Sequence, residues 1–460
     1  MGLVSAGSAR STLAAVGGDR VRALQHVLYR AAKADPDRRF HALFDKIFRR
    51  DVLDRAWEQV RRNRGAAGID KVTLADVEEY GVPRLLDELA GELRCGGYRP
   101  LPARRVFIPK PGSSGERRPL SIPTVRDRIV QAAVKIVLEP VFEADMADCS
   151  FGFRPGRSAH DALQVLVDES WRGRRWVVEI DIADCFEAIP HDRLMETVEG
   201  RVCDRAVLKL LRVLLRAGVM QDGSVRRAAT GTPQGGVVSP LLANVYLTRL
   251  DRAWRTSEHG VLVRYVDDAV VMCVSREQAE AALLQLRSLL AELGLQPKEA
   301  KTRIVRLAGD KDGEGVDFLG FHHRLVRGRT PRSKHLTFLA RWPSRKATQH
   351  ARGRIREVTG RSRLCVPVED IVRELNTFLR GWVGFFRYGN STRVFGQIRN
   401  YALRRLALLL SKRGKRRRAW NWGMTQVLLS PNHLGLIDLD GAVIAPRPFR
   451  DWRATAEHRR

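Results

Sequence analysis

Apolar residues recur at three- and four-residue spacing over residues 21–62, and this pattern predicts amphipathic helices in the first part of the chain. Residues 1–20 carry no such pattern and are predicted to form a loose tail. Between about residues 95 and 325, strand-like stretches alternate with helical ones, for example at residues 104–109 and 175–181. The alternation predicts an α+β fold for this part.

The pattern changes after residue 321. Residues 341–418 are rich in Arg and Lys with few acids, and stretches such as residues 370–387 have the spacing of basic amphipathic helices. The run KRGKRRR at residues 412–418 is the densest positive cluster in the sequence. A helical lobe with a basic end is therefore expected to follow the mixed part.

Charge narrows the class of partner. The chain has 460 residues, and its 81 Lys and Arg against 52 Asp and Glu give a net charge of +29. Such an excess attracts polyanions and makes their binding dependent on salt. Charge alone leaves open a ribosomal or chromatin protein, so the choice among nucleic-acid-binding classes depends on motifs.

Two observations bear on location. The six cysteines form no CxxC pair and have no close His partner at zinc spacing, which indicates reduced thiols in the core. Residues 1–20 contain no continuous apolar stretch, so neither a signal peptide nor a membrane anchor is expected. We expect a cytoplasmic, nucleoid-associated protein with no membrane partner.

The clearest candidate for chemistry is Tyr265-Val266-Asp267-Asp268, which lies between two apolar strand-like runs. This arrangement predicts a hairpin turn at which at least one carboxylate faces an open cleft. Aspartates are common in turns for purely local reasons, so the pair alone does not establish catalysis.

Asp181 supplies a third carboxylate, at the end of the apolar stretch at residues 176–180. An acid at the end of a buried strand is costly without a partner, and a divalent cation shared with Asp267 and Asp268 would supply one. Two Mg²⁺ ions about 4 Å apart would activate a primer 3′-hydroxyl and stabilise the departing pyrophosphate, as in two-metal nucleotidyl transfer. The three acids therefore predict a polymerase-like site.

These segments resemble motifs A and C of reverse transcriptases, and further blocks are similar to those of group II intron-encoded proteins, in the same order. The blocks are a Gly-rich connector at residues 63–70, RPLSIPTVRDRIVQ at 118–131, SFGFRPGRSAH at 150–160, GTPQGGVVSP at 231–240 and FLGF at 318–321. The resemblance extends from about residue 40 to residue 440.

The resemblance implies a right-hand polymerase, with fingers and a palm built on an antiparallel sheet, followed by an α-helical thumb and maturase domain. The implied division is a flexible tail at residues 1–20, an N-terminal extension with the first fingers block at 21–100, reverse transcriptase fingers and palm at 101–325, a helical thumb/maturase domain at 326–405 and a basic nucleic-acid-binding segment at 406–460.

By position in these motifs, Asp181, Asp267 and Asp268 resemble the metal-binding acids, with the backbone carbonyl of Ile182 as a further ligand. The resemblance thus implies two Mg²⁺ ions. Phe186, five residues after Asp181, matches the steric gate whose ring would collide with a ribose 2′-hydroxyl, which implies a preference for deoxynucleotides. Ordinary core packing is the alternative for Phe186.

Four residues match positions around the incoming nucleotide: Lys110, Arg118, Gln234 and Tyr265. Lys110 and Arg118 would hold the triphosphate with fixed positive charge, and Gln234 would lie beneath the sugar and base. Lys301 has the place of the motif D lysine that protonates pyrophosphate as it leaves. The alternative for each of these three cations is an ordinary solvated charge.

Arginines in three places are candidates for RNA contact: Arg154 and Arg157 in the block at residues 150–160, Arg380 and Arg387 in the maturase region, and Arg416, Arg417 and Arg418 in the basic run. For the first pair, a purely structural turn is the alternative. The second pair lies among aromatic residues, a composition that suits helix packing on one side and RNA backbone on the other.

Three features depart from the family pattern. Val266 stands where Ala is usual and puts a bulkier side chain next to the primer end. Ala183 and Asp184 stand where a basic residue and Gly are common, so an additional acid lies near the expected metals. No cysteine follows Cys365, so no HNH endonuclease is expected.

The implied function is RNA-directed DNA synthesis, combined with assistance to splicing of a group II intron and copying of that intron into DNA. The implied partners are the intron RNA, an RNA template with a DNA primer, target DNA and dNTPs, and a homodimer is left open. The alternatives are a splicing-only RNA-binding maturase and a domesticated reverse transcriptase in defence or DNA repair. The intact acids with Lys110, Arg118 and Gln234 argue against the first, whereas Val266 leaves the second open.

Overall fold

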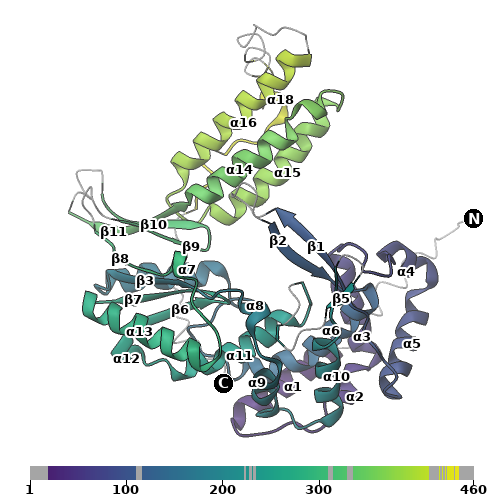
Figure 1. Cartoon of the computed structure of the whole chain (residues 1–460). Coiled ribbons are helices and arrows are strands. Elements are labelled where there is room, and N and C mark those ends of the chain that lie inside the picture. The colour runs from purple at the N-terminus through teal and green to yellow at the C-terminus, as the bar shows by residue number, and fades with distance from the viewer. Residues whose placement is uncertain are drawn as a thin grey trace, which may run out of the picture.

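The computed structural model describes residues 19–109, 117–221, 224–226, 230–231, 235–308, 314–328, 335–413, 424, 427, 430, 432–439 and 441–444. Five residues with predicted roles lie outside this part of the chain: Lys110, Gln234, Arg416, Arg417 and Arg418. The described residues combine many helices with three β-sheets (Figure 1), which confirms the predicted mixture of α and β structure.

Helices of the first part of the chain pack around α6, which is buried along most of its length (Figure 1). The helix begins after Thr124, whose hydroxyl accepts a hydrogen bond from the amide of Asp127 and so satisfies a free N–H group of the first turn. The helices here are α1 (Arg20–Ala34), α2 (Phe44–Ile47), α3 (Arg50–Arg62), α4 (Leu74–Tyr80), α5 (Val82–Arg94) and α6 (Val125–Glu143).

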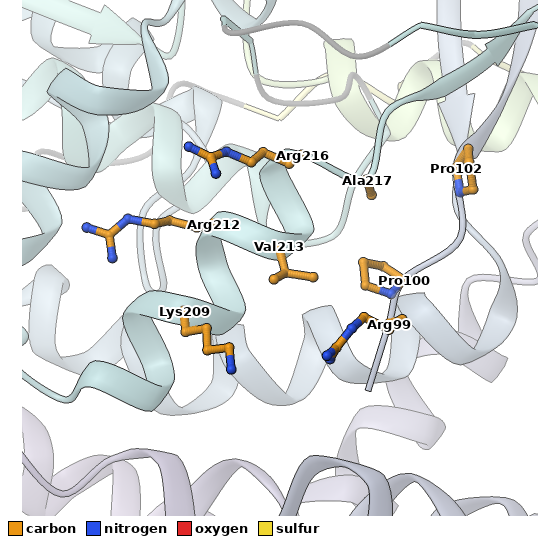
Figure 2. A pocket seen from close by; sticks show the side chains of 8 residues that line it. All are labelled: Arg99, Pro100, Pro102, Lys209, Arg212, Val213, Arg216 and Ala217. Atoms are coloured by element: carbon orange, nitrogen blue, oxygen red, sulfur yellow. The ribbon is translucent and has the colours of Figure 1, made fainter. Parts of the chain in front are cut away.

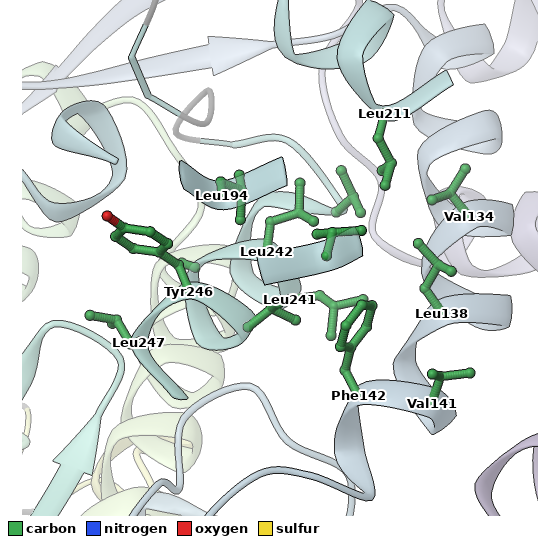
Figure 3. Packing of buried hydrophobic residues seen from close by; sticks show 14 of the residues in the cluster. Val134, Leu138, Val141, Phe142, Leu194, Leu211, Leu241, Leu242, Tyr246 and Leu247 are labelled. Carbon is green, nitrogen blue, oxygen red and sulfur yellow. The ribbon is translucent and has the colours of Figure 1, made fainter. Parts of the chain in front are cut away.

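Three later helices complete this core. Figure 3 shows Leu194, Leu211 and Leu242 from these helices gathered near Leu138 and Phe142 of α6. All five side chains are buried, so the helices are held together by removal of apolar surface from water. The helices are α9 (His191–Glu199), α10 (Arg205–Leu215) and α11 (Ser239–Ala253).

The first sheet has the strand order β2-β1-β4-β5. Its strands are β1 (Ala103–Pro109), β2 (Arg117–Ile122), β4 (Val219–Gln221) and β5 (Ser224–Arg226). β1 and β2 form an antiparallel pair that places Ile108 opposite Arg118. β1 is parallel to β4, so segments far apart in the sequence meet at the base of this sheet.

The second sheet is antiparallel throughout and has the order β6-β7-β3-β8. Because side chains alternate along a strand, Val177 of β3 joins the core beneath α7, whereas Val178 and Ile180 join the core with α13. The sheet thus has a helix on each face (Figure 1). The elements are β3 (Trp176–Asp181), β6 (Val261–Tyr265), β7 (Asp268–Cys273), β8 (Arg303–Arg306), α7 (Ala159–Trp171), α12 (Thr256–His259) and α13 (Arg276–Glu292).

A third sheet, with the order β11-β10-β9, connects the second sheet to a helical lobe (Figure 1). Within α15, Leu375, Leu379, Trp382 and Phe386 are buried at helical spacing. The elements are β9 (Val316–Phe318), β10 (Phe321–Arg327), β11 (Thr337–Pro343), α14 (Arg345–Val358), η2 (Arg361–Arg363), α15 (Val368–Phe386), α16 (Thr392–Arg413) and α18 (Asn432–Gly435).

The C-terminal segment completes the core of this lobe. The Asn376 side chain of α15 donates to the carbonyl of Gly435 at 2.8 Å and accepts from the amide of Ile437 at 2.9 Å. Val427 and Leu439 are buried in the same core. The helices of the lobe are therefore joined to residues far downstream in the sequence.

The prediction that the cysteines lie in the core holds for only some of them. All six cysteines are free, and Cys185 and Cys273 are buried. Cys95 and Cys365, in contrast, are exposed, and Cys95 is the residue that follows the last turn of α5. Among the described residues, no helix combines the length and the apolar character needed to cross a membrane.

Candidate active site

The hairpin and strand β3 bring three carboxylates to one end of the second sheet. In the antiparallel register, Asp268 lies opposite both Tyr265 of β6 and Asp181 of β3. The amide of Ile182 donates to the carbonyl of Asp267 at 3.0 Å, which ties the end of β3 to the turn. Because directly opposed residues point to the same face of a sheet, Asp181 and Asp268 face the same side.

That side opens into a hollow of about 480 Å³. Asp181, Asp268 and Glu179 lie on the sheet wall of the hollow. The opposite wall is formed by the beginning of α14 and by α15, including Lys346, His350, Ala347, Trp382 and Phe386. The carboxylates therefore lie at the junction of the second sheet, the third sheet and the basic helical lobe.

Lys301 pairs with Asp181 in this hollow. Lys301 ends the short helix η1 (Glu299–Lys301), and its Nζ atom donates to Asp181 Oδ2. Burial by itself would lower the pKa of Lys301, but the hydrogen bond and charge of Asp181, with the charges of Asp268 and Asp267, raise it. Lys301 is therefore held protonated next to the three acids.

Burial and the neighbouring acids disfavour the ionised forms of Asp268 and Asp267. Burial raises the pKa of Asp268 to about 8, and the charges of Asp181 and Asp267 add to the shift. The pKa of Asp267 is also raised, chiefly by burial and by the charge of Asp181, against the effects of Lys301 and Arg118. Oxygen ligands with excess negative charge are the donors that divalent cations such as Mg²⁺ take.

The donor chemistry thus fits a divalent cation, but the side chains are not arranged as a closed ligand set. Among the described residues, no three Asp, Glu, His or Cys side chains are grouped closely enough to hold a metal ion. The Asp181 carboxylate is occupied by the Lys301 ammonium. Binding of a cation would require this ion pair to rearrange, since both positive charges would compete for one carboxylate.

The turn of the hairpin has an unusual backbone. Val266 is 2% exposed and has a φ angle of +62°, in the left-handed region that a β-branched residue rarely adopts. Gly152 packs directly on it: a Cβ atom at Gly152 would lie 2.5 Å from Val266 Cγ2 and 2.9 Å from the Val266 amide nitrogen. The glycine of the SFGFRPGRSAH block therefore makes room for the turn.

A buried polar network supports the same turn, and the sequence analysis did not find it. Arg264 is 1% exposed and forms an ion pair with Asp251 of α11, with its Nε atom 2.8 Å from Asp251 Oδ1. Its Nη1 atom donates to the Val266 carbonyl at 3.0 Å. Asn244 accepts from Arg264 at 3.2 Å and donates to the Gly152 carbonyl at 2.7 Å. The network thus holds both sides of the Gly152 and Val266 contact.

One signal in the sequence points to this network. Arg264 is a lone charge in the apolar run Val261-Leu-Val-Arg-Tyr265, and a charge in a buried strand requires a charged or polar partner. The sequence does not show which acid supplies that partner.

Two segments of the chain match family models. Residues 108–323 match the reverse transcriptase (RNA-dependent DNA polymerase) family, and residues 348–428 match the group II intron maturase-specific domain. The chain is also 33% identical to protein YkfC of Escherichia coli in an alignment of length 368 that covers 71% of this chain and 94% of that protein. The chain belongs to the group II intron reverse transcriptase/maturase family.

Other relatives of this reverse transcriptase/maturase are named for introns. It is 38% identical over 216 residues to the group II intron-encoded protein LtrA of Lactococcus lactis, which are 47% of this chain and 35% of LtrA. It is 35% identical over 167 residues to the putative COX1/OXI3 intron 1 protein of Saccharomyces cerevisiae, which are 36% of this chain and 20% of that protein. The chain therefore spans about a third of LtrA and less of the yeast protein.

The other predicted nucleotide contacts of the reverse transcriptase/maturase lie around the carboxylates. Arg118 is exposed on β2, and its charge acts on Asp267. Phe186 lies half-buried in α8 (Cys185–Ala188), packed against the main core. Tyr265 is half-buried, with its ring 6.5 Å from that of Phe153. These placements leave each predicted role open to experiment.

Gln234 lies outside the described residues, but Gly231 and Gly235 of the reverse transcriptase/maturase are described and pack closely on neighbouring backbone. A Cβ atom at Gly235 would lie 2.3 Å from the Ser121 carbonyl of β2, and one at Gly231 would lie 2.9 Å from the Glu187 carbonyl of α8. Both have positive φ angles, so glycine is needed there. Gly235 thus packs on β2 and Gly231 packs on α8.

The prediction of an RNA contact for Arg154 is wrong for this structure. Its side chain is 3% exposed and forms an ion pair with Glu143 at 2.7 Å. It also donates to the carbonyls of Ala147 and Ser150, at 2.5 and 2.7 Å. Because the guanidinium is fully used in closing the turn after α6, the structural alternative holds for Arg154.

The other described arginines differ in access. Arg157 is half-buried and pairs with exposed Asp148 at 2.6 Å. Arg380 is exposed on the face of α15 opposite the buried stripe. Arg387 is half-buried, with its guanidinium 5.8 Å from the ring of Tyr388. Of the described candidates, Arg380 is the most accessible to RNA.

Proposed function

We propose that the chain is an RNA-directed DNA polymerase that binds a group II intron RNA, assists its splicing and copies it into DNA from a primer. The observation that carries the proposal is the register that places Asp181 opposite Asp268 at the Tyr265 hairpin, inside a hollow faced by the basic lobe. Membership of the family and the maturase-specific match support the intron RNA as partner.

In this proposal the second sheet is the palm and the first sheet, with the N-terminal helices, forms the fingers. α14, α15 and α16 are the thumb and maturase domain. The hollow between the palm and α14 then receives the primer terminus and its RNA template. Net charge of +29 supports binding of RNA and target DNA, and a nucleoid-associated location.

Asp181, Asp267 and Asp268, with the Ile182 carbonyl, would hold two Mg²⁺ ions. When bound, the ions would supply a Lewis acid for the attacking hydroxyl and for the departing pyrophosphate. The raised pKa values of Asp267 and Asp268 support this assignment, since a cation would offset the negative charge that burial makes costly. Lys301, released from Asp181, would donate its proton to pyrophosphate.

The nucleotide would lie between the fingers and the palm. Arg118 and Lys110 would hold its triphosphate, and Gln234 would lie beneath its sugar and base. Phe186 and Tyr265 would flank the sugar, with Phe186 as the gate against a 2′-hydroxyl. Arg157, Arg380, Arg387 and the run Arg416, Arg417 and Arg418 would contact RNA backbone.

Primer extension on an RNA template with dNTPs and Mg²⁺ tests the proposal. The wild-type chain is expected to extend the primer, and Asp267→Asn is expected to abolish extension while RNA affinity stays nearly unchanged. Asp192→Asn, which changes an exposed acid on α9, is the matched control and should keep full activity. Extension by Asp267→Asn, or an equal loss of RNA binding, would contradict the proposed role.

A further inference from the structure

A second hollow lies outside the candidate active site, at the base of the first sheet. It has a volume of about 470 Å³ and lies between α10 and the segment that leads into β1. Figure 2 shows Val213 of α10 facing Pro100 across this space. Lys209 of α10 and Arg99 of the opposite segment both lie below this pair in the view. None of its lining residues belongs to the second sheet, so it is separate from the carboxylates.

The α10 wall is basic because of the spacing of its residues. Lys209, Arg212 and Arg216 follow one another at three- and four-residue intervals and share the exposed face, while Leu211 and Leu214 are buried on the other. Arg212 pairs with Glu199, but no ion pair with a described residue is found for Lys209 or Arg216. Two positive charges on this face are therefore available to a ligand.

The basic surface continues into an adjoining hollow of about 270 Å³, which shares Arg99, Lys209 and Val213 and adds Arg94. Within the part of the chain that the structure describes, no acidic side chain lines either hollow. Arg99 is held in place by hydrogen bonds from its Nη1 atom to the carbonyls of Gly96 and Tyr98, at 2.9 and 2.8 Å. The two hollows form one groove with cations along its length.

Both walls of the groove also carry apolar side chains. Pro100, Pro102 and Val213 are half-buried and present flat or branched carbon surfaces between the cations. Unpaired bases are recognised by stacking on aromatic rings, on guanidinium planes and between apolar side chains, while their phosphates bind Arg and Lys. An acidic peptide would satisfy the cations but would leave the apolar side chains of the two walls without a matching flat group.

We propose that this groove binds an unpaired loop of a structured RNA, with a base between Pro100 and Val213 and phosphates on Lys209 and Arg216. The inference rests on the proposed function, since it adds a docking site for the RNA partner of the polymerase. The site anchors RNA while the hollow at Asp181 stays free for a primer and template.

The test uses the full chain and a labelled RNA hairpin with an unpaired loop, added in the presence of saturating unlabelled primer and template. The double variant Lys209→Gln/Arg216→Gln is expected to bind the hairpin about tenfold more weakly, with a salt slope reduced by about 1.4 for two lost phosphate contacts. Primer extension should stay at the wild-type rate. The variant Lys209→Arg/Arg216→Lys keeps both charges and should keep binding.

Arg255→Gln/Arg276→Gln removes two exposed charges from α12 and α13 and controls for overall charge. An equal loss in this control, or an unchanged slope in the groove variant, would overturn the proposal. Competition by polyglutamate as strong as by the hairpin would assign the groove to acidic proteins instead. Loss of extension in the groove variant would also overturn it, whereas a wild-type chain without extension would refute only the polymerase.

Discussion

Gly152 lies so close to Val266 that a Cβ atom on the glycine would come within 2.5 Å of the valine Cγ2 atom. The contact joins the SFGFRPGRSAH block to the turn between β6 and β7. The two family motifs are thus packed together as one unit. Asn244 donates to the Gly152 carbonyl and Arg264 donates to the Val266 carbonyl, and these hydrogen bonds stabilise the contact. The position of the carboxylates depends on this unit.

Gly152→Ala is expected to displace the turn. The new methyl group meets both Val266 Cγ2 and the Val266 amide, so relief requires a backbone shift that costs about 1–3 kcal/mol. We expect a lower melting temperature. We also expect a loss of primer extension that is larger than the loss of stability alone would cause. Gly91→Ala on α5, where an added Cβ meets nothing within 4 Å, is the control: it should leave primer extension unchanged and, because Ala favours a helix interior, should not lower the melting temperature. Full activity of Gly152→Ala would show that the turn tolerates displacement.

Substitutions at Arg264 should distinguish its contribution to the stability of the fold from its role in positioning the hairpin turn. Arg264→Met leaves Asp251 buried without its partner, at a cost of roughly 3–5 kcal/mol. The double variant Arg264→Met/Asp251→Leu removes both charges and is expected to recover most of that stability.

Because the bond to the Val266 carbonyl is still missing in the double variant, its kcat is expected to fall about 10- to 100-fold, with little change in the KM for dNTP. Steady-state primer extension measures both constants. Recovery of kcat together with stability would mean that Arg264 acts on folding alone.

Phe186→Val is expected to admit ribonucleotides, because a smaller side chain leaves room for a 2′-hydroxyl. The ratio of kcat/KM for dNTP over rNTP should fall by about tenfold or more. Phe48→Val, another half-buried phenylalanine packed against the same core, controls for lost packing and should leave the ratio unchanged. An unaltered ratio in Phe186→Val would assign the residue to the core.

The raised pKa of Asp268 predicts a dependence of stability on pH in metal-free buffer. The group faces Asp181, Asp267, Glu179 and Lys301, and its pKa in the folded protein is about 8. Between about pH 4 and pH 8 the folded chain holds a proton that the unfolded chain has released. The stabilisation that protonated Asp268 gives to the folded chain is therefore complete below about pH 4 and is lost as the pH rises through about 8.

Asp268→Asn has no such proton, so its melting temperature relative to wild type should rise between pH 5 and about pH 8 and then level off. Thermal unfolding in EDTA over this range measures the difference, and Mg²⁺ should reduce it at high pH. A constant difference across the range would show that Asp268 is ionised throughout.

The three carboxylates could be predicted from sequence because acids at the ends of apolar strands stand out from their neighbours. The helices of the lobe could be predicted for a similar reason, since the stripe through Leu375 and Leu379 repeats at helical spacing. Both signals are local. The prediction of a mixed α and β fold followed from such local signals.

What could not be predicted depends on pairs far apart in the chain. Arg154 lies in a block rich in Gly and Pro and has the pattern of an exposed residue, but the end of α6 brings Glu143 to it. Arg264 finds Asp251 only because α11 packs beneath β6. The parallel pairing of β1 with β4 joins residues that no local pattern relates.

The bonds from Asn376 to Gly435 and Ile437 span 59 and 61 positions of the chain. During synthesis, α15 leaves the ribosome well before the partners of its buried amide have been translated. The helical lobe therefore cannot finish folding together with the sheets that precede it. In a nascent chain, the sheet that carries the carboxylates will already be formed while α15 of the lobe still exposes its apolar stripe. Chaperone binding should therefore concentrate on α15.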